Sequence, residues 1–178
     1  GSRKSQTYSN FNDFMYNLSY WSSWSNGFNI WKSEFDKIDK NLKLNKLFPH
    51  TSLFLTQHQA KLFCINDNLL FDVQRIPKRG GHNKFEAFTI EYPSLLDECC
   101  KKGHISTKCK KHILFGIMVQ FLPSLLFNKY IIRIETFDDT GFRDNLKKYY
   151  PSYAYWLVLI SVLGVPFRLF CRKLKNKR

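Results

Sequence analysis

Nineteen consecutive positions, from Tyr149 to Phe167, carry no charged side chain, and this stretch restricts the fold more than any other feature of the chain. A helix of that length spans about 28 Å, close to the ~30 Å hydrocarbon core of a bilayer. Tyrosines and a tryptophan gather at its start, as at a membrane interface. We therefore predict a membrane helix within 149–178, with a buried C-terminal helix and a solvated basic tail as the alternative. The membrane segment is expected to include Tyr149, Tyr153, Trp156, Leu159 and Phe167.

Basic residues follow the uncharged stretch and give an expected orientation. By the positive-inside rule, the C-terminal tail should lie in the cytosol and residues 1–148 in a lumen or outside the cell. The basic side chains are expected to contact lipid headgroups or other phosphates. They are Arg168, Arg172, Lys173 and Lys175.

The N-terminal part has a helical period. From Phe11 onward, apolar and mostly aromatic residues recur every three or four positions, the spacing that keeps one helix face apolar. Because Asn26-Gly27 is a helix-breaking pair, two helices are predicted, at 11–24 and 28–44. We expect their apolar face to pack on the core. The alternative is contact with a membrane interface or a partner helix.

Between residues 47 and 148, short apolar runs and alternating patterns are typical of antiparallel strands. The run 113–127 contains Gln120 and Pro123 and is short for a membrane span. A buried strand with a connecting segment is therefore expected there, with a second membrane segment as the alternative. Strands are expected at 53–55, 61–65, 69–76, 85–92, 113–122 and 130–137, and a short helix at 141–150.

These patterns predict an α+β chain in three parts. Residues 1–46 form a helical, aromatic-rich N-terminal segment, and residues 47–148 form a small antiparallel β core. Residues 149–178 form a C-terminal hydrophobic membrane helix with a basic cytosolic tail.

The segment from Cys99 to Cys109 is the nearest approach to a metal motif. Over these eleven residues, Cys99, His104 and Cys109 have the spacing of the last three ligands of a CCHC zinc knuckle, which the segment resembles. Leu96 stands where the first cysteine of a knuckle would be. Since a structural zinc ion needs four ligands, Cys100 or His112 would have to complete the set. Zinc is thus a candidate ligand, but no cofactor is expected.

A lumenal location of residues 1–148 would favour disulfides instead. Adjacent cysteines rarely bridge each other, so Cys99 and Cys100 would each pair elsewhere. One or two disulfides are expected among Cys64, Cys99, Cys100 and Cys109, while Cys171 lies beyond the membrane segment. Reduced cysteines without a role are the third alternative.

No sequence motif indicates catalysis. Asp139-Thr140-Gly141 is similar to the aspartic-protease motif, but Phe142 follows where that family prefers a small residue, and too few residues remain for a protease lobe. We expect Asp138 to Gly141 to form a turn that begins a helix.

The charge balance indicates acidic partners. The chain has 28 lysines and arginines against 14 acidic residues, a formal net charge of +14. Scarce alanine with abundant phenylalanine, lysine and asparagine suggests an AT-rich coding sequence, and codon bias is then the alternative explanation for part of this charge. We expect a non-enzymatic, membrane-anchored interaction or structural subunit of a membrane protein complex. Its partners would be membrane lipids and other protein subunits, with no small-molecule substrate. The alternative is a soluble basic RNA-binding subunit of an organellar ribonucleoprotein.

Overall fold

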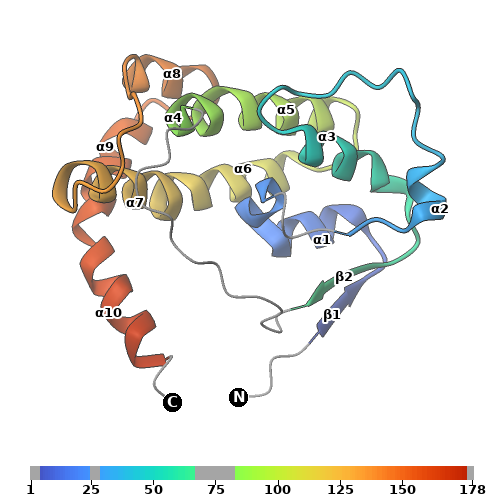
Figure 1. Ribbon diagram of the computed structural model, residues 1–178, viewed down its shortest axis with the longest axis horizontal. Helices are drawn as coiled ribbons and strands as arrows, with labels where there is room; N and C mark the ends of the chain where they lie inside the picture. The colour runs from blue at the N-terminus through green and yellow to red at the C-terminus, as the bar shows by residue number, and fades with distance from the viewer. Residues whose placement is uncertain (1–4, 25–28, 67–82, 176–178) are drawn as a thin grey trace. The chain divides into compact units, whose positions relative to one another are not determined.

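The computed structural model describes residues 5–24, 29–66 and 83–175, with side chains as far as Cys171 (Figure 1). Most of the described chain is helical, and it contains a two-stranded antiparallel sheet, so the α+β class is confirmed in this coarse form. The chain divides into two compact units. One contains Gly1–Arg75 and Glu91–Ile113, and the other contains Ile76–Ile90 and Leu114–Arg178. The predicted division at residues 46 and 148 stays a prediction.

The first unit contains the sheet, in which Tyr8 pairs with Phe63. Its first helix is capped by Asn10, whose Oδ1 accepts the backbone N–H of Asp13; such a cap satisfies a backbone donor that the helix itself cannot. The elements are β1 Ser5–Tyr8, α1 Phe11–Leu18, η1 Ser19–Ser23, α2 Lys32–Phe35, α3 Pro49–Leu55, η3 Thr56–Gln59, β2 Phe63–Asn66, α5 Tyr92–Lys101 and most of α6 Thr107–Gly116.

Aromatic rings and one buried polar contact form the core of this unit. Phe14 stacks on Phe63 with ring centroids 5.0 Å apart. Tyr92 and Leu96 are fully buried, and the Tyr92 hydroxyl lies 2.5 Å from Ser22 Oγ. Because a buried hydroxyl without a partner is costly, this contact fixes η1 against α5.

The second unit is built from helices. Phe85, Leu122, Leu146 and Val158 are buried in its core, and α9 packs on η5 and α7. Its elements are α4 Lys84–Glu86, most of η4 Ala87–Glu91, η5 Ile117–Phe121, α7 Leu122–Leu126, η6 Phe127–Ile131, α8 Phe142–Tyr149, α9 Ala154–Leu163 and α10 Val165–Lys175.

Several predicted elements have the right type. The helix at 11–24 is confirmed as α1 followed by η1, and the short helix at 141–150 is confirmed as α8. The strand at 61–65 corresponds to β2. The predicted helix at 28–44 is confirmed only as α2. Short helices depend on tertiary packing, and the exposed Trp31 and Phe35 supply none.

The prediction of a larger antiparallel β core is wrong. Residues 53–55 belong to α3, 85–92 to the continuous helix from α4 to α5, and 113–122 to α6, η5 and the start of α7. Residues 130–137 start in η6 and continue without strand structure. An apolar run buried on several sides has the same sequence appearance in a helix and in a strand. The strand predicted at 69–76 lies outside the described residues.

One helix of the described chain, Thr107–Ile131, is long and apolar enough to cross a membrane. Much of it is buried, and a core helix of a soluble protein can be equally long and equally apolar. The C-terminal segment qualifies only if α9 and α10 are counted as one span, since they are bent by 50° at Gly164. The single continuous helix expected there is therefore corrected to two helices (Figure 1).

Candidate functional site

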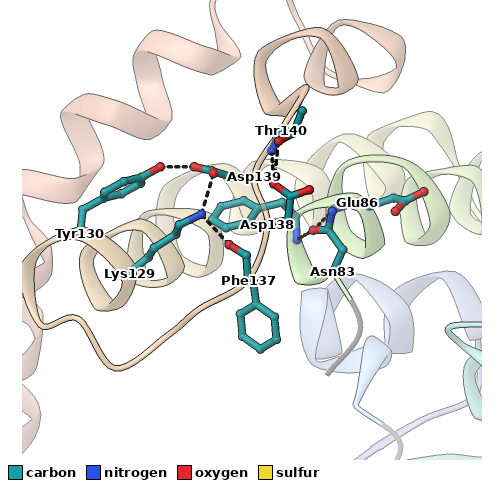
Figure 2. Close-up of polar contacts among 9 residues, drawn as sticks. Asn83, Glu86, Lys129, Tyr130, Phe137, Asp138, Asp139 and Thr140 are labelled. Atoms are coloured by element: carbon teal, nitrogen blue, oxygen red, sulfur yellow. Dashed lines mark hydrogen bonds and ion pairs between the residues drawn. The ribbon is translucent and has the colours of Figure 1, made fainter. Parts of the chain in front are cut away.

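A partly buried ion pair fastens the segment between η6 and α8 in the second unit. Lys129 Nζ donates to Asp139 Oδ1 at 2.6 Å and to the carbonyl oxygen of Phe137 at 2.5 Å (Figure 2). The Tyr130 hydroxyl donates to the other carboxylate oxygen of Asp139. The Lys129 and Asp139 side chains are only 19% and 24% exposed. Both oxygens of this carboxylate are therefore engaged, and η6 holds the chain that leads into α8.

This environment shifts the ionisation of Asp139. Burial raises its pKa, but the hydrogen bonds from Lys129 and Tyr130 and the Lys129 charge together outweigh burial, so the pKa lies below its ordinary value. The carboxyl is therefore ionised in the folded protein near neutral pH.

The residues beside Asp139 form the expected turn. Asp138 Oδ1 accepts the backbone N–H of Thr140 at 2.9 Å and its hydroxyl at 2.7 Å (Figure 2). Gly141 has a φ of 73° and begins α8, and glycine adopts this left-handed conformation without the usual steric cost. The prediction of a turn that begins a helix is confirmed.

We expect Asp139→Asn to destabilise the protein by roughly 1–3 kcal/mol at pH 7, because it leaves the Lys129 charge partly buried without its anion. The folded-state pKa of Asp139 is lowered, so its stabilising contribution is present above the unfolded pKa of about 4 and is lost as pH falls through the folded value. Urea unfolding from pH 7 to pH 3 measures both effects.

In that series, the variant's deficit should shrink as the pH falls. Asp144→Asn is the matched control, since its partner Lys147 and Asp144 itself are both largely exposed, and exposed pairs contribute little. Equal stability of the Asp139 and Asp144 variants at pH 7 would contradict the structural role of the buried pair.

A small basic cleft lies where α8 approaches the start of α9. It has a volume of about 310 Å³, including space open to solvent. The Arg143 guanidinium lies over the Tyr155 ring, 5.4 Å from its centroid, and Lys147 Nζ lies 2.7 Å from Asp144 Oδ1. The cleft is lined by Arg143, Leu146, Lys147, Pro151, Ser152, Tyr155 and Trp156.

Exposed apolar side chains recur from Tyr153, the residue before α9, through α9 and α10, and we call them the apolar stripe. Its members are separated by three or four positions and are 58% to 81% exposed. The opposite face, with Ala154, Val158 and Val165, is buried in the second unit. The helices therefore present one apolar face to the core and another to the surroundings. The apolar stripe consists of Tyr153, Trp156, Ile160, Leu163, Phe167 and Phe170.

The predicted membrane and phosphate-contact residues are only partly brought together. Tyr149 and Leu159 are half-buried and lie outside the stripe. Arg168 donates to the backbone carbonyl oxygens of Val119 and Ser161. The other predicted basic residues, Arg172, Lys173 and Lys175, lie on α10, but their side chains are outside the described part.

The predicted zinc ligands have other contacts. The ring of His104 stacks on that of His58 at 3.5 Å, and the ring of His112 stacks on that of Tyr16 at 4.0 Å. The Cys109 thiol donates to the carbonyl oxygen of Asn12 at 3.6 Å. Within residues 5–24, 29–66 and 83–171, no three His, Cys, Asp or Glu side chains are grouped so that they could hold a metal ion.

The cysteines are all free thiols in this structure. Cys99 is buried, and burial raises the pKa of its thiol to about 11. Cys64 is exposed on β2 and Cys100 is half-buried. The pairing expected for an oxidising compartment stays a prediction.

The sequence prediction does not include Arg143 or Lys147. A signal for them exists, since two basic residues four positions apart on a predicted helix share one face, and this pair comes directly before the aromatic cluster. The partnership of Lys129 with Asp139 has no comparable signal, because it depends on how the intervening segment folds back.

No protein-family model, curated protein or solved structure matches the chain.

Proposed function

We propose that this chain is a non-enzymatic protein that attaches to a lipid bilayer through the apolar stripe and acts as an interaction or structural subunit of a membrane complex. The stripe is the observation that carries the proposal. Six large apolar side chains, each more than half exposed, recur every three or four positions from Tyr153, just before α9, to Phe170 in α10. Contact with lipid would remove them from water, which is favourable in proportion to the apolar area covered.

The distribution of charges along the stripe favours lipid as its partner. Tyr153 and Trp156 mark one end of an uncharged stretch, and basic positions of α10 mark the other. Amphipathic aromatic rings and basic side chains are the groups that membrane interfaces favour. Because Val158 and Val165 face the core, lipid would contact only one side of these helices.

The predicted orientation is a finer form of the same proposal. In that form the basic C-terminal end lies at the cytosolic leaflet, whose anionic lipids attract lysine and arginine, and residues 1–148 lie on the other side. The length and composition of Thr107–Ile131 are compatible with a second membrane segment. Exposed rings of Trp21, Trp24 and Trp31 would offer contacts to other subunits.

RNA binding is the second candidate. Trp31 and Phe35 are exposed beside lysines of the first unit, and exposed rings among basic residues suit stacked bases. However, Lys32 is paired with Asp36 and Lys37 with Glu34, which reduces the local positive charge. The apolar stripe has no such opposing feature, so we favour the membrane.

Flotation of the intact protein with phosphatidylcholine vesicles tests the proposal. We expect the protein to rise with the vesicles in a density gradient and to stay bound in high salt, because the attachment is mainly apolar. A protein that stays at the bottom of the gradient and is soluble without detergent would refute membrane attachment. Salt-sensitive binding to single-stranded RNA would then support the second candidate.

A further inference from the structure

We propose that the cleft between α8 and the start of α9 binds the phosphate of an anionic phospholipid headgroup. This inference rests on the proposed attachment through the stripe, and not on the transmembrane orientation, and it adds the class of lipid that the protein selects. The cleft and the apolar stripe share Trp156. A phosphate in the cleft would therefore place the lipid's acyl chains beside the stripe.

The first support is the kind of side chain that lines the cleft. Arg143 and Lys147 are four positions apart on α8, so they lie on the same helix face. Ser152 adds a hydroxyl group from the connection to α9. A guanidinium, an ammonium and a hydroxyl are donors suited to phosphate oxygens, and arginine binds them with two parallel hydrogen bonds.

The second support is that Arg143 is oriented but not neutralised. Its guanidinium lies over the Tyr155 ring, and Tyr155 in turn contacts Trp156, with ring centroids 5.4 Å apart. Among the described side chains, Arg143 forms no ion pair. Stacking on a ring leaves the in-plane N–H groups of a guanidinium free to bind an anion.

The acidic side chains near the cleft, Asp144 and Asp139, are bound to groups other than Arg143. Asp144 is bound to Lys147 at 2.7 Å, but both side chains are exposed, and such pairs exchange partners at little cost. Asp139 lies near Arg143 in the adjoining depression, and it is already held by Lys129 and Tyr130. The N-terminal end of α9 lies at the cleft and adds a partial positive charge.

The test compares vesicles of phosphatidylcholine alone with vesicles that also contain phosphatidic acid, whose phosphate is the whole headgroup. We expect the intact protein to prefer the phosphatidic acid vesicles. In the double variant Arg143→Gln/Lys147→Gln, this preference should fall by about tenfold or more, while flotation with phosphatidylcholine vesicles stays unchanged. Both residues are exposed, so the circular dichroism and the melting temperature should match those of the wild type.

A matched double variant, Lys43→Gln/Lys148→Gln, removes the same charge from exposed positions outside the cleft. It should keep most of the preference. An equal loss in both double variants, or no preference in the wild type, would overturn the inference and leave membrane attachment standing. Failure to float with either kind of vesicle would instead refute the proposed function. Displacement of the protein from phosphatidic acid vesicles by millimolar inorganic phosphate would show that the cleft takes free phosphate, and would also overturn the lipid assignment.

Discussion

Replacing Ile160 by aspartate should reduce binding to phosphatidylcholine vesicles by roughly 100-fold. Ile160 lies in the middle of the apolar stripe and is 65% exposed, so the fold tolerates a polar side chain there. A charged residue at the centre of a membrane-spanning helix costs about 2.5–3.5 kcal/mol, and contact with lipid on one face only favours the lower end of this range, which corresponds to about 100-fold. Flotation or sedimentation with a vesicle titration measures the change.

Asn41→Asp is the control for this variant, because it adds one negative charge at an exposed position of the first unit. It should bind vesicles like the wild type. If the Ile160 variant also binds like the wild type while its circular dichroism is unchanged, the stripe does not contact lipid, and the proposed function loses the observation that carries it.

Aspartate at position 158, two positions earlier, should instead destabilise the fold. Val158 is fully buried on the core side of α9, so Val158→Asp places an unpaired carboxylate among apolar side chains. The expected loss is about 3–5 kcal/mol, a large part of the 5–15 kcal/mol that stabilises a typical domain. We expect the second unit to unfold or to melt far below the wild-type temperature.

Urea unfolding in mild non-ionic detergent, followed by circular dichroism, compares the two aspartate variants directly. Ile160→Asp should retain wild-type stability and Val158→Asp should not. Equal stability of the two would show that α9 is not packed on one side, and that it is surrounded evenly, as in a free-standing span. The pair therefore separates attachment through one face from the single span that the sequence predicts.

Local signals explain the elements that could be predicted from sequence. Asn10 caps α1, and the turn chemistry of Asp138 to Gly141 begins α8. The apolar residues of 85–92 and 113–122 misled the prediction because burial on several sides removes the helical period. At Ala87, Phe88 and Thr89, three consecutive side chains are buried.

The candidate site could be predicted from sequence only where its residues are close together along the chain. Tyr153, Trp156 and Phe167 belong to the uncharged stretch and lie on the stripe. Leu159 belongs to the same stretch but is half-buried and lies outside the stripe. Which side of α9 faces the core depends on its packing against η5 and α7. The amino-acid composition of α9 does not indicate which side that is.

Neither of the two units is a continuous stretch of sequence, and this limits how the chain can be divided. Each unit is assembled from separated stretches, because 76–90 belongs with the C-terminal part and 91–113 with the N-terminal part. A single break within the chain would therefore divide at least one of the units. Neither unit can therefore be cut out or transplanted as one continuous segment of the chain.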